Sequence, residues 1–121
     1  MNTAQIGRCG EDAAARYLVS KGYRIAEKNF RTHTSELDII AYSKDGMICF
    51  VEVKTRKNAD FGYPCEAVNY RKRIKITQGA MSYIRSRHIE CEVRFDVIEV
   101  YGGFVGGVFA VSKINHIENA F

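Results

Sequence analysis

The sequence predicts an α/β domain in which a single mixed central sheet is flanked by helices. Two segments have the spacing of amphipathic helices, and apolar runs of strand length lie between and after them. An Asp-Gly pair joins two of these runs, which is a good hairpin signal. The chain has 121 residues, 46% of them hydrophobic, which suits one domain with one core. The expected element order is α-β-β-β-α-β-β.

The N-terminal half is expected to contain one helix and three strands. The helix runs from about Thr3 to Lys21, and Gly22 is placed to end it. Asp45-Gly46 is expected at the turn between the second and third strands. The predicted strands are Tyr23 to Lys28, Glu36 to Tyr42 and Met47 to Thr55.

The C-terminal half is expected to contain a second helix and two more strands. Asn69 is positioned to cap the helix, and Gly106-Gly107 interrupts the last strand. The sequence pattern of the tail from Asn115 to Phe121 is ambiguous. The elements expected there are a loop from Asn58 to Pro64, a helix from Asn69 to about Arg87, and strands from Val93 to Tyr101 and from Phe104 to Val111.

Charged residues in the fourth strand indicate that it has a wet face or lies toward a sheet edge. These residues are Glu92, Arg94, Asp96 and Glu99. Asp96 is expected in an ion pair of the sheet rather than in a functional site. The histidines show no partner pattern and are expected at the surface; they are His33, His88 and His116.

Acidic side chains stand at one end of the predicted hairpin. Side chains alternate across a strand, so Glu36 and Asp38 share a face, as do Glu52, Lys54 and Arg56. The opposite face carries Leu37, Ile39, Val51 and Val53, whereas Ile40 and Phe50 continue the polar face. The carboxylates therefore lie at one end of a face that turns apolar, and not on a simple wet outer face.

If the two strands pair, Asp38 and Glu52 converge. Two carboxylates held close together repel each other unless a cation or a proton lies between them. Mg²⁺ prefers one or two carboxylates together with water and substrate phosphates. Lys54 reaches the same place, where it would activate water or neutralise a phosphate. The same spacing also fits an ordinary cross-strand ladder of ion pairs, and the residues alone leave both interpretations open.

Basic residues are clustered in a chain whose formal net charge is +4. One face of the second predicted helix carries a basic and polar stripe, which would suit phosphate contacts beside a metal site. The same stripe equally suits a solvated surface. The candidate nucleic-acid contacts are Arg31, in the loop before the hairpin, and Arg56, Arg71, Lys72, Lys75 and Gln78.

Other features limit the class of protein. No apolar run approaches the roughly 20 residues of a membrane-spanning helix, and the first residues do not follow the pattern of a signal peptide. The cysteines and histidines lack the spacing of a zinc site. A cytoplasmic protein without a membrane partner is therefore expected.

The same residues carry a family likeness. Asp38 with Glu52-Val53-Lys54 resembles the PD-(D/E)xK nuclease motif, on the hairpin where that superfamily carries it. Over its whole length the chain resembles the YraN-type family of small, largely uncharacterised bacterial proteins. The segments that carry this likeness are Gly10-Glu11, Asn29 to Arg31, Glu36 to Ile40, Phe50 to Arg56, Lys72 to Ala80, Arg94 to Val97 and Asn119 to Phe121.

The resemblance implies a restriction-endonuclease-like fold, close to Holliday-junction resolvases and tRNA-endonuclease-like domains. By that likeness Asp38 and Glu52 bind Mg²⁺, with Mn²⁺ as a substitute, and Lys54 serves the hydrolysis. Glu11, at the rim of the buried face of the first helix, would complete the site, although it also fits a solvated helix glutamate. The chain departs from the likeness at Ser35, where the family usually has glycine, and at Leu37, where the superfamily motif has proline.

The leading hypothesis is a Mg²⁺-dependent endonuclease that cuts structured or branched DNA. Asp38 and Glu52 would hold the metal, Glu11 would support it, and Glu36 would bind through water. Resolvase-like enzymes cut two strands and often work as dimers, so a homodimer is compatible with this hypothesis. One alternative is a nucleic-acid-binding module of the same fold that lacks turnover or needs a partner, and another is a protein-interaction domain.

Overall fold

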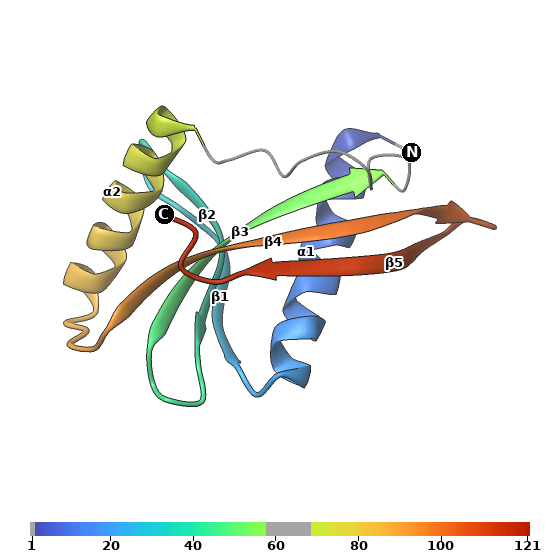
Figure 1. Cartoon of the computed structure of the whole chain (residues 1–121). Coiled ribbons are helices and arrows are strands. Elements are labelled where there is room, and N and C mark those ends of the chain that lie inside the picture. The colour runs from blue at the N-terminus through green and yellow to red at the C-terminus, as the bar shows by residue number, and fades with distance from the viewer. Residues whose placement is uncertain (1, 58–68) are drawn as a thin grey trace.

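The computed structural model describes residues 2–57 and 69–121, which form two helices and one five-stranded sheet (Figure 1). The helices are α1 (Thr3–Ser20) and α2 (Tyr70–Ser86), and the strands are β1 (Arg24–Arg31), β2 (Glu36–Tyr42), β3 (Ile48–Lys57), β4 (Val93–Val105) and β5 (Val108–Ile117). This order confirms the predicted α/β class, and it is consistent with a restriction-endonuclease-like fold. The loop predicted from Asn58 to Pro64 lies outside the described residues.

Both helices begin at caps supplied by the sequence. The Asn2 side chain accepts a hydrogen bond from the backbone N–H of Gln5, and the Gln5 side chain accepts one from the backbone N–H of Asn2, which forms a capping box. Gly22 follows α1 with φ +92°, a conformation that glycine adopts readily. Asn69 caps α2 as predicted, by accepting a hydrogen bond from the backbone N–H of Lys72 at 2.9 Å. Over the described residues, neither helix is long and apolar enough to cross a membrane.

The sheet separates two buried clusters, one under each helix (Figure 1). The strands follow the order β1-β2-β3-β4-β5, and all neighbours are antiparallel except β3 and β4, which are parallel and connected through α2. The cluster against α1 includes Ala14, Leu18, Ile39, Val51 and Ile98, and the cluster against α2 includes Leu37, Ile40, Phe50, Ile76 and Tyr83. β1 extends to Arg31, so that residue ends a strand rather than lying in the predicted loop.

The last hairpin differs from the prediction. β4 continues to Val105, and the turn is formed by Gly106 and Gly107, whose φ angles are +57° and +80°. Positive φ at both central residues is what a tight two-residue hairpin turn requires, so the chain reverses there instead of continuing one strand from Phe104 to Val111. β5 consequently extends to Ile117, into the tail for which the sequence pattern predicted no element.

Asp96 and Glu99 are buried in a strand that has neighbours on both sides, so the prediction of a wet face or an edge position for β4 was wrong, whereas Arg94 is half-buried and the exposed Glu92 precedes the strand. β4 lies between β3 and β5, and Asp96 and Glu99 are 0% and 1% exposed. Asp96 accepts two hydrogen bonds from the Arg94 guanidinium, at 2.8 and 2.7 Å, and one from the backbone N–H of Asn119 at 3.0 Å. His116 Nε2 lies 2.7 Å from the same carboxylate, so His116 is not the predicted surface residue.

These bonds decide the ionisation of the buried aspartate. Burial alone would raise the pKa of Asp96, but hydrogen bonds from His116 and Arg94 bring it below its ordinary value. The ion pair with Arg94 confirms that Asp96 serves the sheet. Through His116 and the backbone N–H of Asn119, the Asp96 carboxylate also connects the end of β5 and the following residues to the central strand β4.

We expect Asp96→Asn to destabilise the protein by about 3 kcal/mol, because it removes the buried counter-charge of the half-buried Arg94 guanidinium and leaves it only the exposed Glu118 carboxylate, 3.5 Å away. The measurement is the free energy of unfolding from urea titration at pH 7, followed by circular dichroism. Asp12→Asn is the matched control, since Asp12 pairs with Lys28 in an exposed position. The control should change the free energy by less than about 1 kcal/mol, and equal effects of the two variants would contradict the role of Asp96.

Candidate functional site

A cavity of about 770 Å³ opens where the start of β2 and the middle of β3 meet the first turns of α2. Its acidic residues are Glu36, Asp38 and Glu52, and its basic residues are Arg31, Arg71, Lys72 and Lys75. Thr32, His33, Thr34, Ser35, Asn69 and Ile76 complete the wall. Most of the residues selected from the sequence therefore meet in one place.

Asp38 lies where the pairing of β2 with β3 ends. The last paired residues are Ile39 and Val51, and beyond them the Asp38 carboxylate accepts a hydrogen bond from the backbone N–H of Val53 at 2.9 Å. Leu37 packs in the α2-side cluster, whereas Ile39 packs in the α1-side cluster. The predicted placement of these two residues on one face was wrong, because alternation breaks at Asp38. The carboxylate takes the place of a strand partner for Val53 and is fixed there.

Glu52 points from β3 toward α2. It has the same phase along the strand as Phe50, which packs under that helix. The residue is only 5% exposed, and its Oε1 lies 2.5 Å from Nζ of Lys72. Lys72 lies in the first turn of α2, and its side chain is 47% exposed. This ion pair joins a central strand to the start of the helix that covers it.

The two carboxylates and Lys72 share one electrostatic environment. Burial is the main reason that the pKa of Asp38 rises to about 7, and the negative charge of Glu52 raises it further, while the hydrogen bond from Val53 opposes the rise. Burial alone would lower the pKa of Lys72, but the hydrogen bond and charge of Glu52 hold it above its ordinary value. The cavity therefore favours a proton or a cation near neutral pH.

Glu11 approaches the same carboxylates from α1, outside the cavity wall. Its negative charge contributes to the raised pKa of Asp38. Burial raises the pKa of Glu11 itself, against a hydrogen bond with Asn29 of β1. Glu36 lies at the exposed rim of the cavity, where its carboxylate is 3.2 Å from the guanidinium of Arg31.

Lys54 and Arg56 lie outside the cavity wall, farther along β3. Lys54 shares the phase of Glu52, and Arg56 beyond it approaches the buried carboxylate of Glu99, with 3.8 Å between Nε and Oε2. The lysine that contacts Glu52 is thus on α2, and not two residues farther along the same strand.

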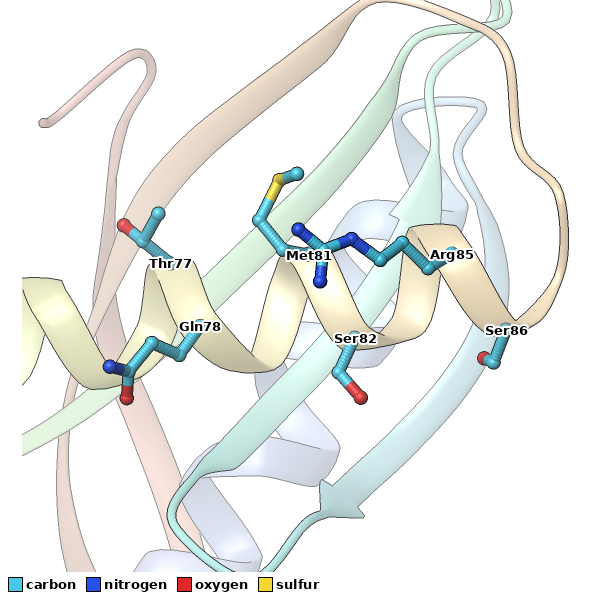
Figure 2. A pocket seen from close by; sticks show the side chains of 6 residues that line it. All are labelled: Thr77, Gln78, Met81, Ser82, Arg85 and Ser86. Carbon is cyan, nitrogen blue, oxygen red and sulfur yellow. The ribbon is translucent and has the colours of Figure 1, made fainter.

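Gln78 lies in a separate hollow of α2 (Figure 2). The side chains that line this hollow all project from one stretch of the helix, and Arg85 supplies a charge among them. They are Thr77, Gln78, Met81, Ser82, Arg85 and Ser86. Because all of these groups come from a single element, this hollow is a weaker candidate than the carboxylate cavity, where several elements converge.

Ser35 supports the cavity, although the family likeness leads one to expect glycine there. Its hydroxyl donates a hydrogen bond to the backbone carbonyl of Lys75 at 2.6 Å, which fastens α2 to the start of β2. Gly79 permits this close approach, since a Cβ at that position would lie 2.8 Å from Cβ of Ser35. Nothing local in the sequence predicts these contacts, because they depend on how the helix docks.

The donor set of the cavity fits a hard divalent cation. Asp38 and Glu52 offer carboxylate oxygens from adjacent strands, and Glu36 adds a third carboxylate at the exposed rim, where it pairs with Arg31. In residues 2–57 and 69–121, no group of three or more His, Cys, Asp or Glu side chains is arranged to hold a metal. A site with few protein ligands is the kind that Mg²⁺ uses, because it keeps several waters and binds substrate phosphates.

The protein is thus an α/β domain whose mixed sheet carries a cavity lined by paired carboxylates and basic side chains. The chain belongs to the uncharacterised protein family UPF0102, which matches residues 10–100. The predicted membership of an uncharacterised family of small bacterial proteins is confirmed. Membership of the PD-(D/E)xK superfamily stays a prediction.

Relatives match the chain over its whole length. A UPF0102 protein of Clostridioides difficile is 48% identical over 122 residues, covering 100% of both chains. One from Caldanaerobacter subterraneus is 46% identical over 122 residues, covering 100% of this chain and 98% of the relative. Among solved structures, Pyrococcus furiosus SfsA in complex with Ca²⁺ is 17% identical with a TM-score of 0.46, covering 93% of this chain and 64% of that chain. A similarity this low does not bear on function.

We expect Asp38→Asn to change how stability depends on pH. Because the folded protein raises the pKa of Asp38 from 3.8 to about 7, the folded state binds this proton more tightly than the unfolded state, and stability falls as pH rises from about 4 through 7. The variant lacks this fall, so its stability relative to the native sequence should increase by up to about 4 kcal/mol between pH 4 and pH 8.

The measurement is urea unfolding at several pH values in EDTA. Asp12→Asn serves as the control, because it removes an exposed carboxylate. Parallel pH profiles for Asp38→Asn and the native sequence would show that Asp38 titrates normally.

Proposed function

We propose that the protein is a divalent-cation-dependent endonuclease, with Mg²⁺ or Mn²⁺ as its cofactor and structured or branched DNA as its substrate. The observation that carries this proposal is the meeting of Asp38 and Glu52 in one cavity with Arg31, Arg71 and Lys75. Carboxylates suit the cation, and the basic side chains suit phosphates. The preference for branched DNA rests on the resemblance to resolvases, and a homodimer would let the enzyme cut two strands.

Each carboxylate has a role in the proposed chemistry. A bound Mg²⁺ would activate water and stabilise charge on the phosphate. Asp38 and Glu52 would hold the cation, Glu11 would support it from the side of α1, and Glu36 would act through water. Lys54, on the same face of β3 as Glu52, would assist the attacking water or the phosphate.

The basic side chains of α2 would position the nucleic acid. This helix has five Arg or Lys residues and no Asp or Glu, and four of the five lie in its first six residues. The helix dipole disfavours cations at a helix N-terminus, so an anionic partner there would offset that cost. Arg71 and Lys75 would contact phosphates from the cavity wall, while Arg56 and Gln78 would extend the contact on either side.

A nucleic-acid-binding module without turnover is the second candidate, and the ion pair between Lys72 and Glu52 favours it. An ammonium group already neutralises the buried carboxylate in this structure. With that pair kept closed, the cavity would present a basic rim to phosphates and would need no metal.

We expect the purified protein to cut branched DNA in Mg²⁺ or Mn²⁺ and not in EDTA, as judged by gel electrophoresis of labelled junctions and linear duplexes. Asp38→Asn and Glu52→Gln should each reduce cutting at least about 100-fold, because each removes a charged ligand of the cation. Asp12→Asn should cut at the native rate. Salt-sensitive binding without cutting would favour the module, and no DNA affinity at moderate salt would favour a protein-interaction domain.

The double variant Arg71→Ala, Lys75→Ala should bind DNA more weakly and with less dependence on salt. Each lost phosphate contact lowers the slope of log affinity against log salt by about 0.9, so the slope should fall by about 2. The slope is measured by fluorescence anisotropy in EDTA, over a salt range of roughly 50 to 200 mM. Arg16→Ala changes an exposed residue of α1 and should leave the slope unaltered, whereas an equal effect of both variants would mean that α2 is not the contact.

A further inference from the structure

In the described residues, buried carboxylates of the sheet form ion pairs at Glu52, Asp96 and Glu99, and the pairs at Asp96 and Glu52 are built differently. Asp96 is held by the guanidinium of Arg94, which binds both carboxylate oxygens and is 16% exposed. Glu52 is held by one atom of Lys72, whose side chain is 47% exposed. A planar guanidinium suits a permanent bidentate pair, whereas lysine is a point charge on a flexible stem. The pair at Glu52 is therefore the one suited to exchange.

The backbone of Lys72 is fixed while its ammonium group has room to move. Asn69 accepts a hydrogen bond from the backbone N–H of Lys72, and the Ser35 hydroxyl binds the carbonyl of Lys75 one turn later. The start of α2 is thus anchored at both positions. The half-exposed side chain lines the same cavity as Arg71 and Lys75, so its ammonium can leave Glu52 without leaving the site.

We propose, building on the proposed function, that Lys72 is an exchangeable internal counter-ion: it neutralises Glu52 in the cation-free protein, gives way to a divalent cation, and then contacts a phosphate of the nucleic acid. Lys72 is a positioning residue in this scheme. It reduces the repulsion between the two carboxylates before the cation binds. When the cation displaces it, its ammonium becomes free to contact the nucleic acid, so that cation binding strengthens substrate binding.

The first test is calorimetric titration of MgCl₂ and MnCl₂ into the full chain at pH 8. Lys72→Met removes the competing ammonium and should tighten cation binding about tenfold, which corresponds to about 1.4 kcal/mol. Lys75→Met is the matched control, since it removes the same charge from the same helix and cavity and should change affinity less than about twofold. Lys72→Gln keeps a hydrogen-bond donor for Glu52 and replaces Lys72→Met if that variant does not fold in EDTA.

The outcomes separate this inference from the proposed function. Tighter binding by Lys72→Met but not by Lys75→Met supports the exchange even if no DNA is cut. Equal affinity of Lys72→Met and the native protein overturns the exchange and leaves the nuclease proposal standing. No cation binding by either protein overturns both.

The second test measures DNA affinity by fluorescence anisotropy in EDTA and in Ca²⁺, a divalent cation that also takes oxygen ligands. In EDTA, Lys72→Met should bind DNA nearly as the native protein does, because Glu52 holds the ammonium. With the cation present the variant should bind roughly fivefold more weakly, while Lys75→Met should weaken binding in both conditions. An equal loss for Lys72→Met in both conditions would make Lys72 a plain phosphate contact and overturn the exchange.

Discussion

Glu52 is a nearly buried carboxylate beside a second carboxylate, Asp38, at the end of the pairing between two strands. Removing such a charge from water is unfavourable by several kcal/mol unless a partner neutralises it. The partner in this structure is Lys72, which α2 supplies. The covering helix must therefore dock with its first turn over β3. The hydrogen bond from Ser35 to the carbonyl of Lys75 and the close approach at Gly79 hold it in that position.

The buried carboxylates Asp96 and Glu52 lie on opposite faces of the sheet and are neutralised by different kinds of partner. On the face of α1, Asp96 has an arginine, a histidine and a backbone N–H as partners, and it has the phase of Ile98 in the α1-side cluster. That network closes β4 onto the end of β5 and leaves its carboxylate fully buried. On the face of α2, Glu52 opens into a cavity and relies on a half-exposed lysine. The first arrangement stabilises the fold, and in the proposed exchange the second would leave Glu52 available to another cation.

The elements that the sequence predicted well are those that local chemistry determines. Asn69 caps its helix, and the Asp45-Gly46 turn closes the hairpin, with Gly46 at φ +83° and a hydrogen bond from Ser43 to Met47. The antiparallel pairing of the two strands, which the hairpin predicts, also brings Asp38 and Glu52 to one cavity, with Asp38 just beyond the last paired residues.

The errors concern contacts between distant segments. His116 looked like a surface residue because Asp96, its partner, is 20 residues away on another strand. Lys54 looked like the lysine of the cavity because it is close to Glu52 in sequence, whereas Lys72 reaches Glu52 only once α2 has docked. Strand alternation failed at Asp38, where the carboxylate replaces a strand partner for Val53.

Asp38 and Glu52 differ in how firmly their carboxylates are held. A cation that binds both of them would therefore compete with a different group at each one. Asp38 is fixed by the backbone N–H of Val53, and its pKa of about 7 means that a proton occupies it for much of the time near neutral pH. Glu52 is held by the ammonium of Lys72, whose flexible side chain is half-exposed. In the proposed exchange, a divalent cation would displace a proton from Asp38 and the Lys72 ammonium from Glu52. Loss of the proton from Asp38 becomes easier as pH rises, and the repulsion between the two ionised carboxylates would then favour a divalent cation.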